Sequence, residues 1–175
     1  MKQFSIIILM SLITLLGGVG DVWAQTKLTT TGGDLPSGSY IIRDNNHYTN
    51  STITIKSGSN VTIDLNGYVL CGDFKSSGYV LSVEDGATLT IKDTRPTLGH
   101  EGYLNDEGLF VWPYANGNDR IVVGGGIIYN KRKADINTKG ISVAGTCIIE
   151  CAKIMGCYAD DIGAAVTITS SGSFT

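Results

Sequence analysis

The stretch VTIDLNGYVL, residues 61–70, indicates the fold, and it places one acid, Asp64, inside a run of apolar and β-branched residues. The stretch ATLTIKD, which begins at Ala87, has the same build: alternating Val, Thr, Ile and Leu, followed by a polar corner. Such repetition is typical of proteins made of stacked, similar units. Asp64 stands just before the turn LNG, where an aspartate accepts hydrogen bonds from backbone N–H groups. We therefore interpret Asp64 as a structural residue of a repeated corner and not as a catalytic acid.

Short strands separated by Gly- and Asn-containing turns are predicted along the whole chain after residue 24. The strand candidates are YIIRD (from Tyr40), STITI (Ser51), VTIDL (Val61), YVL (Tyr68), YVLSV (Tyr79), ATLTI (Ala87), RIVV (Arg120), ISV (Ile141), CIIE (Cys147) and AVTIT (Ala165). Three pairs of residues recur one coil apart: Val61 and Ala87, Ile128 and Ile154, and Val143 and Val166. Two or three short strands with their corners need about 20–25 residues, so the spacing predicts a β-solenoid.

Six segments of the sequence resemble parts of a known family. STITIKSGSNVTIDLNGYVL and GYVLSVEDGATLTIKDT resemble the opening coils of bacterial surface proteins of the right-handed parallel β-helix (pectate-lyase-like) superfamily. GGGIIYN, GISVAG, CAKIMGCYA and GAAVTITSSGSFT are similar to the later coils of that superfamily. The resemblance covers most of residues 37–175 and implies an all-β, right-handed, single-stranded parallel β-helix. One departure is Cys157, which stands where the family corner usually carries a stacked Asn.

The two ends of the sequence suggest how the chain is organised. Lys2 and the apolar core IIILMSLITLLGGVG (residues 6–20) predict a signal peptide cut near Ala24, and hence a secreted or cell-surface protein. No membrane span is expected after cleavage. We expect an N-terminal cap with the first strands at 25–50, and coils at 51–175 with an insertion at about 93–120. AVTIT begins a strand near the C-terminal end, so we expect the solenoid to be incomplete there. Further coils or a partner would then cap that end.

The composition argues against several classes of partner and cofactor. A net charge of −3 gives no bulk attraction to nucleic acid, so no nucleic-acid partner is expected. The four cysteines do not follow metal-ligand spacing, and the two histidines, His47 and His100, lie in loop-like contexts. We therefore expect no metal and no cofactor, and we expect most of the cysteines to be small buried side chains.

The predicted insertion at 93–120 contains aromatic and polar residues of the kinds that bind sugars. Aromatic rings stack on the apolar face of a pyranose, while acids, amides and cations bond its hydroxyl groups. The candidate ligand-binding residues are Trp112, Tyr114, Tyr103, Asp106 and Arg120. The partner would then be a polysaccharide or a cell-surface glycan. The alternative is that LFVWPY is a partly buried strand that covers the solenoid.

A catalytic alternative rests on the segments INTKG and YADD. Polygalacturonase-type glycosidases of the same fold carry Asn-Thr-Asp-Gly and, about one coil later, Asp-Asp, which resemble residues 137–140 and the pair Asp160 and Asp161. The resemblance implies that such carboxylates would protonate the leaving oxygen and activate water. Lys139 stands in place of the first acid, and a coincidence of ordinary corners explains the match better than catalysis does. A polysaccharide lyase would need a dense acidic cluster, which the sequence lacks.

We therefore predict an exported, non-catalytic β-helix module that binds a glycan or a protein at the surface, or that serves as a rigid scaffold. The alternative is a polysaccharide-degrading enzyme, either a polygalacturonase-like hydrolase or a polysaccharide lyase, present as a fragment or in degenerate form. Fold-level analogy favours this alternative, but only by association.

Overall fold

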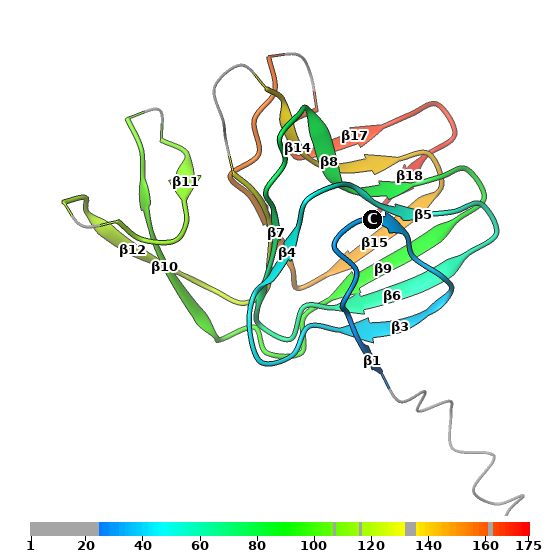
Figure 1. The fold of residues 1–175 in the computed structure, drawn as a ribbon, viewed down its shortest axis with the longest axis horizontal. Coiled ribbons are helices and arrows are strands. Elements are labelled where there is room, and N and C mark those ends of the chain that lie inside the picture. Colours follow the sequence, from blue (N-terminus) through cyan, green and yellow to red (C-terminus); the bar gives the residue numbers. More distant parts are fainter. Residues whose placement is uncertain (1–24, 107, 116, 132–135, 161–162) are drawn as a thin grey trace, which may run out of the picture.

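The computed structural model describes residues 25–106, 108–115, 117–131, 136–160 and 163–175. The described chain is all-β and contains no helix, and so no helix that could cross a membrane (Figure 1). The predicted signal peptide lies outside the described residues.

The strands follow the chain in short pieces separated by turns. They are β1 (Thr26–Lys27), β2 (Gly33–Asp34), β3 (Gly38–Ile41), β4 (His47–Thr49), β5 (Ile53–Ile55), β6 (Asn60–Asp64), β7 (Val69–Gly72), β8 (Gly78–Val83), β9 (Thr88–Lys92), β10 (Gly99–Leu104), β11 (Phe110–Val111), β12 (Arg120–Gly124), β13 (Ile127–Asn130), β14 (Thr138–Val143), β15 (Thr146–Glu150), β16 (Lys153–Met155), β17 (Val166–Ile168) and β18 (Ser173–Phe174). Each strand candidate of the sequence overlaps one of these strands, so those predictions are confirmed. His47 and His100 lie in strands β4 and β10, and not in loops as predicted.

Three parallel sheets contain most of the strands. Sheet A has the order β1-β3-β6-β9-β15-β18, sheet B the order β17-β14-β8-β5-β2, and sheet C the order β16-β13-β7-β4. From β4 onward the chain visits sheets C, B and A in that order four times, and we call each such passage a coil. The coils are β4–β6, β7–β9, β13–β15 and β16–β18. This arrangement of parallel strands is compatible with the predicted β-solenoid.

The register of the coils matches the sequence spacing in one place and differs in two. Ile128 lies opposite Ile154, as their spacing predicts. Val61 lies opposite Leu89 instead of Ala87, and Val143 lies opposite Ile168 instead of Val166. Each difference is two residues, which preserves the face to which a side chain points because strand side chains alternate with a period of two. The corners differ in length, and the apolar face, not a constant coil length, sets the register.

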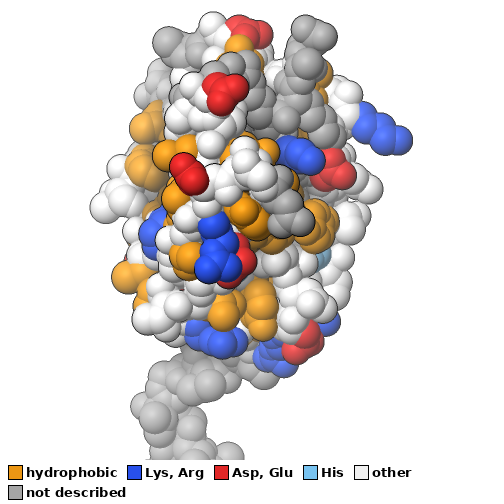
Figure 2. All heavy atoms as spheres, turned by 90° about the vertical axis from the view of Figure 1, so that its left-hand side faces the viewer, with side chains coloured by type: hydrophobic (Ala, Val, Ile, Leu, Met, Phe, Trp, Pro, Cys, Tyr) orange, Lys and Arg blue, Asp and Glu red, His pale blue; other side chains and the backbone are white. Residues whose placement is uncertain are grey.

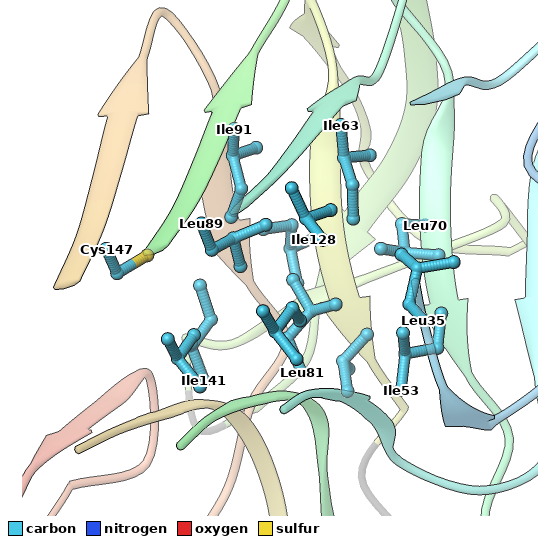
Figure 3. Close-up of a cluster of buried hydrophobic side chains, with 14 of the residues drawn as sticks. Leu35, Ile53, Ile63, Leu70, Leu81, Leu89, Ile91, Ile128, Ile141 and Cys147 are labelled. Atoms are coloured by element: carbon cyan, nitrogen blue, oxygen red, sulfur yellow. The ribbon is translucent and has the colours of Figure 1, made fainter. Parts of the chain in front are cut away.

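Ladders of Leu, Ile and Val fill the interior between the three sheets (Figure 3). Ile53, Leu81 and Ile141 form one such ladder on sheet B, and all three are completely buried. Each side chain of this size contributes about 2 kcal/mol when buried. The rows that contain Val143 and Cys147 continue into the last coil as Ile168 and Phe174, which are 52% and 37% exposed.

Asp64 is a structural residue at the corner that leads from sheet A to sheet C. Its carboxylate is 1% exposed, and its Oδ1 accepts hydrogen bonds from the backbone N–H groups of Asn66 (2.9 Å) and Thr94 (3.1 Å). The Thr94 hydroxyl lies 2.9 Å from Oδ2. Asn66 adopts φ 49°, a left-handed conformation that Asn tolerates better than most residues. Asp64 thus ties its own corner to the corner of the next coil.

Asp93 fixes both ends of an insertion between β9 and β13. Its Oδ1 accepts hydrogen bonds from the backbone N–H groups of Gly67 (2.6 Å) and Arg95 (3.1 Å), and its Oδ2 accepts one from Gly126 (2.6 Å). The residues between these contacts form a small antiparallel sheet, sheet D, with the order β11-β10-β12. Figure 1 shows this sheet beside sheet C, on the left of the molecule. We call the insertion that forms it, from β10 to β12, the hairpin.

All four cysteines lie within the described residues, and none of them forms a disulfide there. Cys71 and Cys147 are buried, Cys157 is half-buried and Cys151 is exposed. Burial raises the pKa of Cys147 to about 12, so this thiol stays protonated and unreactive at neutral pH.

Candidate binding site

The outer face of sheet C is apolar, unlike an ordinary solvent-exposed sheet face. Strands β7 and β13 are buried along their whole length. Since successive side chains of a strand point to opposite faces, Leu70 and Ile128 face the interior while Val69, Cys71 and Tyr129 face outward. A strand that is apolar on both faces needs cover on both faces.

The hairpin of sheet D covers this outer face. Phe110 and Trp112 form a second apolar cluster with the outward residues of β7 and β13. Both rings meet Tyr129 edge to face, with centroid distances of 6.4 Å for Phe110 and 6.0 Å for Trp112. The backbone N–H of Trp112 donates a hydrogen bond to the Tyr129 hydroxyl oxygen (3.2 Å). Burial raises the pKa of Tyr129, so its phenol stays neutral in this contact.

His100 secures the base of the hairpin. Its Nε2 lies 2.6 Å from the carbonyl oxygen of Gly67, at the corner that precedes β7. Its ring also meets Trp112 edge to face at 6.5 Å, and the residue is 6% exposed. These contacts give His100 a structural role, because its ring is occupied by the corner and by the indole.

A cleft opens where the hairpin ends beside the first coil. Tyr48 of β4 lies opposite Cys71 in the sheet and stacks on Trp112, with ring centroids 6.2 Å apart and an interplanar angle of 28°. Tyr48 is 52% exposed, whereas Trp112 is 8% exposed. The cleft has a volume of about 130 Å³ and is lined by Tyr48, Cys71, Gly72, Asp73, Trp112, Pro113 and Lys131.

The cleft combines an aromatic wall with polar groups of both charges. Partial burial raises the pKa of the Tyr48 hydroxyl, with smaller contributions from Cys71 and Asp73, so the hydroxyl remains a hydrogen-bond donor at neutral pH. Asp73 can accept hydrogen bonds and Lys131 can donate them. Within the described ranges, no group of three His, Cys, Asp or Glu side chains is placed to hold a metal ion. The chemistry available here is stacking and hydrogen bonding.

The five predicted ligand residues do not form one site. Trp112 lines the cleft, but mostly as a buried wall, as the alternative of a covering strand predicted. Tyr103 and Arg120 are neighbours across β10 and β12, on the opposite face of the hairpin from His100, and Arg120 pairs with Glu101 at 3.1 Å. Figure 2 views the molecule from this side and shows acidic and basic side chains scattered between hydrophobic ones.

The remaining two predicted residues lie at the ends of the hairpin. The Tyr114 hydroxyl donates to the carbonyl oxygen of Asn118 (2.9 Å), within its own loop. Asp106 is exposed in the turn after β10. Neither residue lines the cleft among the described residues.

Tyr48, Asp73 and Lys131 were missed because their neighbours in the sequence suggested only loops. The available signal was YVLCG and GGGIIYN, which are apolar at consecutive positions instead of alternate ones. A run of this kind predicts a strand buried on both faces, and hence a covering element with a boundary beside it. Tyr48 lies at that boundary.

The segments INTKG and YADD lie side by side, because the backbone N–H of Asp160 donates a hydrogen bond to the side-chain oxygen of Asn137 (2.8 Å) and Thr138 forms an antiparallel bridge with Tyr158. The Asp160 carboxylate accepts a hydrogen bond from the Tyr158 hydroxyl (2.5 Å). Lys139 Nζ lies 5.6 Å from the ring centroid of Tyr79. Asp161, the other predicted carboxylate, lies outside the described residues.

The chain was compared with protein families, curated proteins and solved structures. No family model, no curated protein and no solved structure matches this chain. The function is therefore inferred from the cleft and from the surfaces around it.

Proposed function

We propose that this chain is an exported, non-catalytic module with a right-handed parallel β-helix of the pectate-lyase-like type, and that it binds a glycan in the cleft between the hairpin and sheet C. The repeated order of sheets C, B and A supports the β-helix. The in-register apolar ladders support it as well, because stacked coils stabilise one another through such contacts.

The observation that carries the proposal is the stacked pair Tyr48 and Trp112 at the cleft. Trp112 is held from behind by Tyr129 and His100, so it fixes the plane of the exposed Tyr48 ring. A flat aromatic surface fixed in this way suits the apolar face of a pyranose, and it loses little conformational freedom on binding.

The polar groups of the cleft suit a sugar for a second reason. Asp73 and Lys131 stand beside the aromatic wall, so ring hydroxyls would find both an acceptor and a donor. The cleft volume of about 130 Å³ is well below the roughly 300–1,000 Å³ of pockets that enclose whole ligands. We infer that one ring of a longer chain is bound, with the rest of the chain in solvent.

Export is proposed from residues 1–24, which carry the positive and apolar regions of a signal peptide. A cell-surface or secreted location would bring the cleft into contact with extracellular polysaccharides. N-terminal sequencing of protein recovered from the cell surface or the medium tests this, with Gln25 expected as the first residue. Retention of Met1 in the surface or secreted protein would contradict the proposal.

Glycan binding is tested by affinity electrophoresis in gels that contain soluble polysaccharides, with Tyr48→Ala and Tyr103→Ala compared. Both tyrosines are partly exposed, but only Tyr48 lines the cleft. We expect Tyr48→Ala to reduce retention about ten-fold, since stacking and burial of an aromatic ring contribute about 1–2 kcal/mol. Tyr103→Ala should be retained like the original chain.

Two outcomes would contradict the proposal. Loss of retention in Tyr103→Ala alone would move the site to the outer face of the hairpin. Shortening of the polysaccharide by the original chain, abolished in Asp160→Asn, would establish the enzyme alternative.

A further inference from the structure

The outer face of sheet A carries hydroxyl groups where the outer face of sheet C carries apolar side chains. Ser39, Thr62 and Thr90 lie opposite one another on β3, β6 and β9. Each of these side chains is half-buried. Adjacent strands in a sheet are about 4.8 Å apart, so the three hydroxyls form a regular row across the strands.

A groove crosses the strands at this row. Its volume is about 580 Å³, and it is lined by Thr26, Ser37, Gly38, Ser39, Asn60, Val61, Thr62 and Thr90. These residues belong to β1, β3, β6 and β9 and to the turn before β3, so the groove runs from coil to coil and not along one strand. None of the residues that line it is charged.

The hydroxyls of Thr62 and Thr90 make no hydrogen bond to any other residue that the structure describes. The side-chain oxygen of Ser37 accepts a hydrogen bond from the backbone N–H of Asn60 (3.0 Å), which fixes the wall of the groove. A hydroxyl can both donate and accept, so a row of free hydroxyls matches a ligand that presents many hydroxyls at regular intervals.

We propose that this groove binds an extended, neutral polysaccharide that runs across the strands of sheet A. A charged polymer is disfavoured here, because its ionic groups would lose water without gaining a partner of opposite charge. The side-chain row supplies one hydroxyl on each of β3, β6 and β9, and Gly38 and Val61 also line the groove. This site is separate from the cleft at Tyr48 and does not depend on it.

The test is affinity electrophoresis of the chain in a linear neutral glucan, a mannan and a xylan, with polygalacturonate as the charged comparison. Thr62→Val and Thr90→Val, alone and together, remove the hydroxyls and keep the β-branched shape. Thr54→Val is the matched control, since Thr54 is a half-buried threonine on the outer face of sheet B. Circular dichroism and thermal unfolding confirm that each variant keeps the fold.

We expect at least one neutral polymer to retard the chain more than polygalacturonate does, and the double variant to weaken that retention about ten-fold, since each net hydrogen bond contributes about 0.5–1.5 kcal/mol. Thr54→Val should leave it unchanged. The proposal is overturned if no neutral polymer retards the original chain, or if the double variant is retarded as strongly as the original. Loss in Tyr48→Ala without loss in the double variant would likewise overturn it and assign all glycan binding to the cleft.

Discussion

Sheets A and C are built from strands of the same coils, yet their outer faces differ. Strand β9 alternates between buried and half-buried residues, with Thr88 and Thr90 facing outward. Strand β13 is buried at every position, with Ile127 and Tyr129 facing outward. The difference follows from the hairpin, which covers sheet C. An apolar residue on an outer strand face therefore marks contact with another element, and a hydroxyl marks a face left open to solvent or to a ligand.

The difference also separates the two proposed sites. At sheet C, the boundary between the hairpin and the first coil leaves a small aromatic cleft at Tyr48. At sheet A, the outer face itself forms a larger uncharged groove. The first site would hold one sugar ring, whereas the second would follow a chain across several coils.

The largest expected effect on stability comes from the substitution that removes the cover of sheet C. Trp112→Ala leaves a cavity against Tyr129 and His100, and should lower the free energy of unfolding by about 3–5 kcal/mol in urea denaturation. Val122→Ala is the control, since Val122 is 61% exposed on the same hairpin and should change stability by less than about 0.5 kcal/mol. Equal losses in both variants would show that the hairpin does not pack through its indole.

The next largest effect comes from a pair of substitutions that compares the outer faces of sheets C and A directly. Ile127→Thr buries a hydroxyl beneath the hairpin and should cost about 2–3 kcal/mol. Thr90→Val makes the reverse kind of change on the open face of sheet A and should cost less than about 0.5 kcal/mol. Both substitutions keep a β-branched side chain, so strand propensity stays nearly constant. Thermal unfolding measures both losses of stability. A larger loss in Thr90→Val than in Ile127→Thr would contradict the difference between the two faces.

A smaller effect is expected at the acid that holds the hairpin. Asp93→Asn keeps the size of the side chain, but it replaces one acceptor oxygen by an NH₂ group that faces backbone donors of Gly67, Arg95 or Gly126. Unfolding should become easier by about 1–3 kcal/mol. Asp85→Asn, at an exposed turn, is the control and should be neutral. No loss in Asp93→Asn would mean that the three backbone contacts do not hold the insertion.

The smallest effect concerns the corner that leads from sheet A to sheet C. Cys151 adopts φ 61° there, and Asn66 adopts φ 49° at the corresponding corner of an earlier coil. Because glycine reaches this conformation without steric cost, Cys151→Gly should stabilise the chain by about 0.5–1 kcal/mol. Cys151→Val should destabilise it, and differential scanning calorimetry measures both. Destabilisation by glycine would indicate that the thiol makes a contact of its own.

Much of the fold follows from alternation in the sequence. VTIDL and ATLTI alternate between large apolar and polar residues, so their strands and inward faces could be predicted. The register could be predicted only to within two residues, because corners of different length still place the same face inward. Asp64 was assigned correctly because its place before LNG indicates a turn.

The candidate site was harder to predict because it depends on contacts between distant coils. LFVWPY indicates an aromatic segment, but the sequence alone does not show whether Trp112 faces solvent or sheet C. That depends on Tyr129 and Cys71, whose outward direction follows from pairing across the insertion. Tyr48 joins Trp112 only through the register of β4 with β7.

The most direct test of the central claim is a tryptophan fluorescence titration with the polysaccharide that most strongly retards the double variant Thr62→Val and Thr90→Val, in which the groove of sheet A lacks two of its hydroxyls. Trp112 is the one tryptophan among the described residues, and it lines the cleft. The account predicts a saturable change in emission that Tyr48→Ala abolishes and Tyr103→Ala preserves. An unchanged spectrum at saturating polysaccharide, or an unchanged response in Tyr48→Ala, would contradict glycan binding in the cleft.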